Sequence, residues 1–67
     1  MTNTQLLRTL IKNKGVKIGY IAEKMGISRQ SLYLKVNGKR AFNQYEIKSL
    51  CEVLDINSDD GKTIFFN

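Results

Sequence analysis

The sequence provides no covalent or metal brace, so helix packing alone must hold the fold together. It has one cysteine, Cys51, which rules out a disulfide within the chain, and no histidine to complete a zinc-finger ligand set. A chain of 67 residues buries only about 60% of the surface that its unfolded form exposes. We therefore expect one small domain over residues 1–67, in a reducing compartment and without a metal.

Basic residues are concentrated in the first forty positions. The whole chain carries a formal charge of +5, but residues 1–40 hold nine Lys or Arg residues against one acidic residue, Glu23, a net charge of +8. Residues 41–67 have a net charge of −3. This asymmetry favours nucleic acid or another anionic surface as the partner, although a basic surface that only confers solubility has the same composition.

Apolar residues recur with helical spacing in four segments, each bounded by cap-type residues or glycine. The first can be capped by Thr2, Asn3 or Thr4 and ends at Gly15. In the fourth, Glu46 is placed to complete a capping box with Asn43. The other two predicted helices run from Ile18 to Met25, before Gly26, and from Ser28 to Val36, before Asn37-Gly38; the fourth runs from Asn43 to Leu54.

The C-terminal tail, residues 57–67, gives a weaker signal. Ser58 could cap a fifth helix, but Gly61 costs about 1 kcal/mol inside a helix, and the sequence from Thr63 onward favours an extended form. We expect a short extended segment. Its large apolar residues either close the core or form a dimer interface, and the sequence favours the two alternatives about equally: Ile64, Phe65 and Phe66.

Residues 17–36 have the spacing of a helix-turn-helix. Ala22, Gly26 and Leu32 lie at offsets 0, +4 and +10. The residue type at each position has its own steric reason: a small residue allows two helices to approach closely, glycine allows the tight turn, and leucine fills the core. A lone glycine between helices is weak evidence, but this combination is fairly specific.

This pattern resembles the Cro and lambda-repressor-like (XRE-type) helix-turn-helix family of small bacterial and phage regulators. The likeness rests on residues 21–32 and 37–40 and extends over about residues 4–56. It implies a mainly α, compact bundle of four or five helices that binds a double-stranded DNA operator as a homodimer, with helix 28–36 in the major groove. A phage Cro-like repressor in the cytoplasm or nucleoid of a bacterial host is the closest type, with no cofactor, membrane or small-molecule substrate.

The chain departs from the family pattern at two places. Members commonly have a Thr or Asn cap followed by Gln where this chain has Lys17 and Ile18, so we expect Lys17 to replace the usual phosphate contact as a point charge. Many members also bury an Arg–Glu pair at the positions of Ile11 and Val36. An apolar pair of similar size is often neutral or stabilising, so we expect these two side chains to meet in the core.

The third predicted helix has a core side and a DNA side. At about 100° per residue, Leu32 and Val36 point one way, and the opposite arc offers side chains to the bases. Arginine suits guanine, glutamine suits adenine, and leucine suits the thymine methyl group. The candidate base contacts are Arg29, Gln30, Tyr33 and Leu34. Contacts with the DNA backbone position the protein but do not select a sequence, and the candidates for them are Lys17, Asn37, Lys39 and Arg40.

Two classes of function are alternatives to DNA binding, namely an enzyme and a protein-interaction module. An enzyme is disfavoured, because the motif-bearing face has no paired carboxylates, the chain has no histidine to activate Cys51, and no glycine-rich loop could cradle a phosphate. A protein-interaction module is more credible, because some helix-turn-helix domains, such as those of antitoxins, bind a protein partner. Co-purification of that partner would distinguish the two readings.

Overall fold

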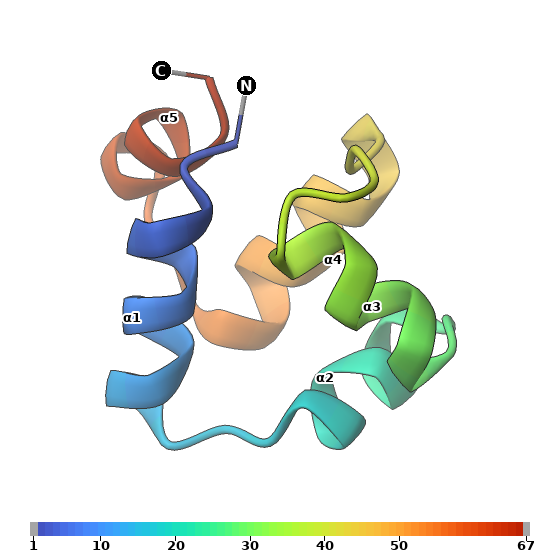
Figure 1. Ribbon diagram of the computed structural model, residues 1–67. Helices are drawn as coiled ribbons and strands as arrows, with labels where there is room; N and C mark the ends of the chain where they lie inside the picture. The colour runs from blue at the N-terminus through green and yellow to red at the C-terminus, as the bar shows by residue number, and fades with distance from the viewer. Residues whose placement is uncertain (1, 67) are drawn as a thin grey trace.

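Five helices account for most of residues 2–66, the part of the chain that the computed structural model describes (Figure 1). Met1 and Asn67, the ends of the predicted domain, lie outside it. The helices are α1 (Thr4–Lys14), α2 (Ile18–Met25), α3 (Arg29–Val36), α4 (Gln44–Leu54) and α5 (Ser58–Phe65). No strand occurs in the described residues, so the expected mainly α fold is confirmed.

Local capping explains where these helices begin and end. Four of the five have a side-chain cap that accepts a hydrogen bond from a backbone N–H three residues on: Asn3, Ser28, Asn43 and Asn57. The predicted capping box between Asn43 and Glu46 is present. Gly15 and Gly26 follow α1 and α2 with φ of 69° and 74°, a left-handed conformation that glycine adopts without strain.

The C-terminal segment corrects the sequence analysis, because it forms α5 and not an extended tail. Asn57, rather than Ser58, caps the helix, and Asp59 and Asp60 lie in its first turn, where negative charge is favourable. Gly61 is buried, and a Cβ built there would lie 3.7 Å from the sulfur of Cys51 on α4. Burial against the rest of the protein therefore outweighs the intrinsic cost of the glycine.

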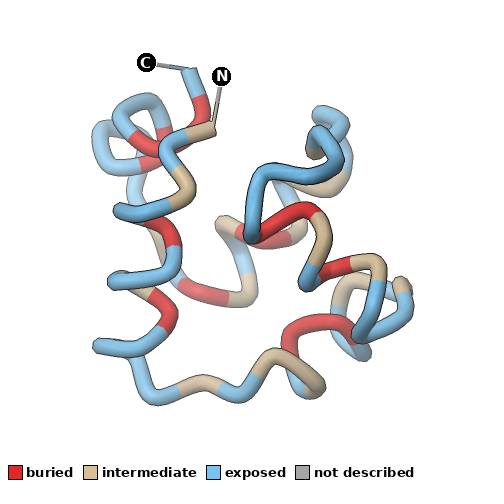
Figure 2. The backbone as a smooth tube through the Cα atoms, viewed as in Figure 1, coloured by how far each residue is buried: buried red, intermediate tan, exposed pale blue. Residues whose placement is uncertain are grey.

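The core draws apolar side chains from all five helices, whose buried residues face the space between them (Figure 2). The buried set is Leu7, Ile11, Ile21, Ala22, Leu32, Val36, Leu50, Leu54, Ile64 and Phe65. Two of the three predicted interface candidates, Ile64 and Phe65, thus lie in the core of their own subunit, while Phe66 is 69% exposed. A hydrogen bond of 2.6 Å from the backbone N–H of Asn3 to the carbonyl of Ile64 fixes the start of α1 beside α5.

Helix packing leaves one side of α3 free. α2 packs against α3 and α4, and α1 packs against α3 and α5. Ile11 and Val36, the expected apolar pair, are both buried in this core and line one surface hollow between α1 and α3. α3 is therefore covered by its neighbours on one face, and its other face forms part of the protein surface.

Candidate nucleic-acid interface

A tight turn joins α2 to α3. Gly26 N–H donates to the carbonyl of Glu23 at 3.2 Å, and Ile27 N–H donates to the carbonyl of Ala22 at 3.1 Å, the pair of hydrogen bonds of a Schellman motif. Ser28 then caps α3 through the N–H of Ser31 at 3.0 Å. With Ala22 buried between the helices, the turn holds α2 and α3 in a fixed relation.

The outer arc of α3 is narrower than the sequence analysis expected. At about 100° per residue, Gln30 and Leu34 lie about 200° from the buried Leu32, but Arg29 lies only about 20° from the buried Val36. Gln30 is exposed, whereas Leu34 is half-buried. Gln30 and Leu34 line one shallow hollow together with Arg40.

Arg29 lies on the flank of α3 that faces α2. A Cβ built on Gly19 would lie 3.0 Å from Nη2, 3.2 Å from Nε and 3.4 Å from Cζ of Arg29, so the guanidinium rests against the backbone of α2. The hollow at this place is lined by both helices and includes Lys17 and the half-exposed Tyr33. Arg29, a predicted base contact, and Lys17, a predicted backbone contact, therefore share one hollow.

The loop that follows α3 carries two exposed cations. The backbone N–H groups of Lys39 and Arg40 donate to the carbonyl of Leu34 at 2.8 and 3.3 Å, which fixes the loop to the end of α3. Neither side chain forms an ion pair with a carboxylate of residues 2–66. Asn37 differs from these two, because its Oδ1 accepts a hydrogen bond from Nη1 of Arg8 on α1 at 3.3 Å.

A mostly buried ion pair connects α3 to the start of α4, and the sequence analysis did not identify it. Nζ of Lys35 lies 2.5 Å from Oε2 of Glu46, with side chains 10% and 14% exposed. Oε1 of Glu46 also accepts from the N–H of Asn43 at 3.0 Å. One signal in the sequence could have indicated that Lys35 is buried. It lies between Leu32 and Val36, two core residues of a helix that the apolar pattern predicts.

The environment of Glu46 favours its charged form. Burial raises the pKa of its carboxyl group, but the hydrogen bonds from Lys35 and Asn43 and the positive charge of Lys35 outweigh this, so the pKa lies below its ordinary value. The ion pair joins the two ends of the loop that carries Lys39 and Arg40, residues 37–43.

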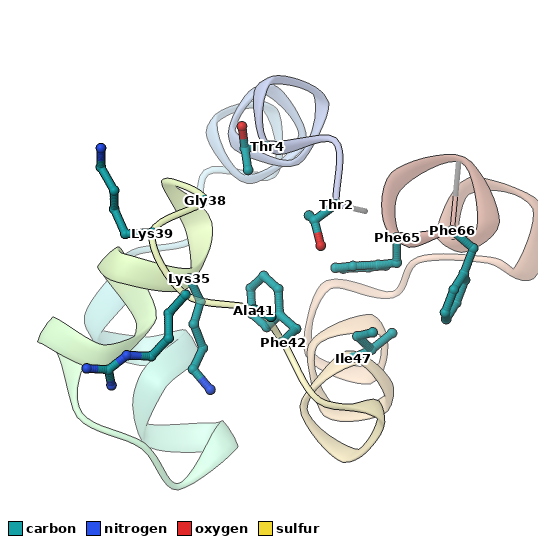
Figure 3. Close-up of a pocket in the computed structure, with 11 residues that line it drawn as sticks. Thr2, Thr4, Lys35, Gly38, Lys39, Ala41, Phe42, Ile47, Phe65 and Phe66 are labelled. Atoms are coloured by element: carbon teal, nitrogen blue, oxygen red, sulfur yellow. The ribbon is translucent and has the colours of Figure 1, made fainter.

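An apolar hollow lies between this loop, the N-terminal segment and α5 (Figure 3). The rings of Phe42 and Phe65 meet edge to face, with centroids 5.7 Å apart and planes at 86°. Ile47 and the exposed Phe66 extend the apolar lining, and Lys39 stands at the rim. The exposed apolar surface of the C-terminal segment is thus next to a basic loop.

Three further features of residues 2–66 concern metal ligands, membrane spans and the cysteine thiol. The described residues contain no cluster of three potential metal-ligating side chains. No helix among them is both long and apolar enough to cross a bilayer. Cys51 is half-buried, and burial raises the pKa of its thiol, which lowers the fraction of reactive thiolate.

The chain matches the model of a known protein family. Residues 3–67 match the family described as "Protein of unknown function (DUF739)". No curated protein matches the chain.

Proposed function

We propose that this chain, which belongs to the DUF739 family, is a sequence-specific duplex DNA-binding protein that acts as a small Cro-like repressor, with α3 in the major groove. One observation carries the proposal. The outer arc of α3, with the exposed Gln30 and the half-buried Leu34, is flanked by cations on both sides: Lys17 and Arg29 on the side of α2, and Lys39 and Arg40 on the loop.

This arrangement matches what a helix-turn-helix needs to bind DNA. The second helix of such a unit enters the major groove with its N-terminal residues against the base edges, while the first crosses the sugar-phosphate backbone. The amide of Gln30 can form two hydrogen bonds with adenine, and Leu34 can contact a thymine methyl group. The flanking cations then contact phosphates, which position the protein without selecting a sequence.

The first test separates base contacts from phosphate contacts. Gln30→Ala is expected to relax base preference at one operator position, at a cost of about 1–3 kcal/mol, because a bidentate contact is lost. Lys39→Ala is expected to weaken binding to all duplexes by a similar factor. Affinities measured for an operator and its single-base variants check this. Altered base preference in Lys39→Ala but not in Gln30→Ala is incompatible with the proposed docking.

A homodimer follows from the same proposal, because a two-fold dimer reads two half-sites about one helical turn apart. The exposed Phe66 and the hollow beside it support a second copy as the occupant, with Phe66 of each copy entering the hollow of the other. Since this hollow is next to Lys39, such a dimer keeps both basic loops near the two-fold axis.

Phe66→Ser is expected to weaken dimerisation by about 10²–10⁴-fold, because each dimer loses the burial of two Phe66 side chains, about 1.5–3 kcal/mol each. The subunit remains folded, because Phe66 is outside the core. Tyr45→Ser is the matched control, since Tyr45 is another exposed aromatic residue and does not line the hollow. Sedimentation equilibrium measures the dissociation constants. Equal dimerisation of the two variants contradicts this interface.

An antitoxin-like or other protein-interaction module is the second candidate, and the same apolar hollow favours it. A protein partner that occupies the hollow co-purifies with the wild-type chain and is lost with Phe66→Ser. A homodimer that forms from the pure chain alone supports the first proposal instead.

A further inference from the structure

Arg29 and Gly19 form a contact that the general docking scheme does not explain. Gly19 lies in the first turn of α2, where its φ is outside the left-handed region, so no backbone conformation requires glycine there. Alanine has the higher helix propensity at such a position. The space that a side chain at position 19 would take is instead filled by the guanidinium of Arg29, whose atoms lie 3.0–3.4 Å from the place where a Cβ would be.

The direction of the Arg29 side chain follows from its place on α3. Arg29 lies about 20° from the buried Val36 and its guanidinium lies against α2, whereas Gln30 and Leu34 leave α3 about 100° and about 140° away from it. Its charge is not neutralised. Glu23 lines the same hollow, but Arg29 forms no ion pair with it or with any other carboxylate of residues 2–66.

We infer that Arg29 binds a phosphate of the DNA backbone rather than guanine, and that Gly19 is the residue that permits this, an inference that rests on the proposed function. The first helix of the unit is the one that crosses the backbone, so a guanidinium lying on α2 beside Lys17 is at the backbone and not at the base edges. Its planar fork of donors fits two phosphate oxygens. Base discrimination then belongs to Gln30 and Leu34.

Gly19 is accordingly a position that determines the role of Arg29. An added methyl group at 3.0–3.4 Å from the guanidinium requires it to shift away from α2 by a few tenths of an ångström. Because Arg29 is a flexible side chain, the helices themselves need not move. Gly19→Ala is therefore expected to weaken the phosphate contact that Arg29→Ala removes, without loss of thermal stability, since alanine favours the helix.

The test measures affinity as a function of salt for wild type, Arg29→Ala and Gly19→Ala, on an operator, its single-base variants and an unrelated duplex. Arg29→Ala is expected to lose affinity for all duplexes by a similar factor and to reduce the magnitude of the log–log salt slope by about 0.9 per subunit, and Gly19→Ala is expected to change both in the same direction by a smaller amount. Lys48→Ala is the matched control, because it removes an exposed lysine of α4 that lies in none of these hollows and is expected to leave the slope unchanged. Melting curves check that each variant is folded.

The outcomes distinguish this inference from the proposed function. If Arg29→Ala abolishes preference at one base pair with an unchanged salt slope, Arg29 reads a base and the inference is wrong, while the proposed function stands. If wild type binds every duplex equally but both variants reduce the slope, sequence-specific regulation is wrong and the phosphate role of Arg29 is supported. If wild type binds no duplex, both are wrong.

Discussion

Raising the salt concentration from about 50 to about 200 mM is expected to weaken operator binding by about 10³–10⁵-fold. Each subunit offers four cations around α3, namely Lys17, Arg29, Lys39 and Arg40, so a dimer forms roughly 6–10 phosphate contacts. Neutralising these phosphates releases condensed counterions, and added salt opposes the release. The expected log–log slope is about −5 to −9.

Fluorescence anisotropy with a labelled duplex measures this slope directly. The double variant Lys39→Ala/Arg40→Ala removes two of the four cations and is expected to reduce the magnitude of the slope by about 1.8 per subunit. A slope near zero for wild type contradicts the electrostatic part of the account, whatever the affinity at low salt.

The second large effect is expected in the ion pair between Lys35 and Glu46. Lys35→Met removes the cation and leaves a mostly buried carboxylate without its counter-charge, which is expected to destabilise the fold by about 3–5 kcal/mol. Urea unfolding measures the loss as a lower midpoint. The double variant Lys35→Met/Glu46→Gln is the control, because glutamine carries no charge and still completes a capping box. It is expected to recover much of the stability. If the single and double variants lose the same amount of stability, the unpaired charge of Glu46 is not the cause of the loss.

Acid titration tests the same ion pair. The pKa of Glu46 is lowered in the folded state from its ordinary value of 4.5, so its contribution to stability is fully present above that value. It is lost as the pH falls through the lowered folded-state pKa, because the unfolded state then binds more protons than the folded state. Wild type is therefore expected to lose stability below about pH 4.5, and Glu46→Gln to lose less over the same range.

Helix positions could be predicted where local capping decides them. Asn3, Gly15, Gly26 and Ser28 act on the backbone within a few residues of themselves, and the structure has them in these roles. The tail could not be predicted in this way. Gly61 and the residues after it disfavour a helix locally, and the burial of Ile64 and Phe65 against distant helices decides the outcome.

The candidate site could be predicted only where local sequence patterns decide the position of a residue. Helical periodicity places Gln30 and Leu34 on the outer arc of α3, and composition places the positive charge in this half of the chain. Arg29 is predicted on the same outer arc, although it lies about 20° from the buried Val36, and the packing of α2 against α3 brings it onto Gly19. The sequence shows Lys35 only as one of the nine basic residues of the first forty positions, because its partner Glu46 lies across a loop whose path the sequence does not specify.

Selection of bound fragments from a random pool of duplexes, followed by sequencing, is the most direct test of sequence-specific binding by α3. The account predicts an enriched motif of two inverted half-sites, with centres about 10 bp apart and an adenine in each half-site whose enrichment is lost with Gln30→Ala. Retention of duplexes without any enriched sequence, or no retention at low salt, contradicts the account.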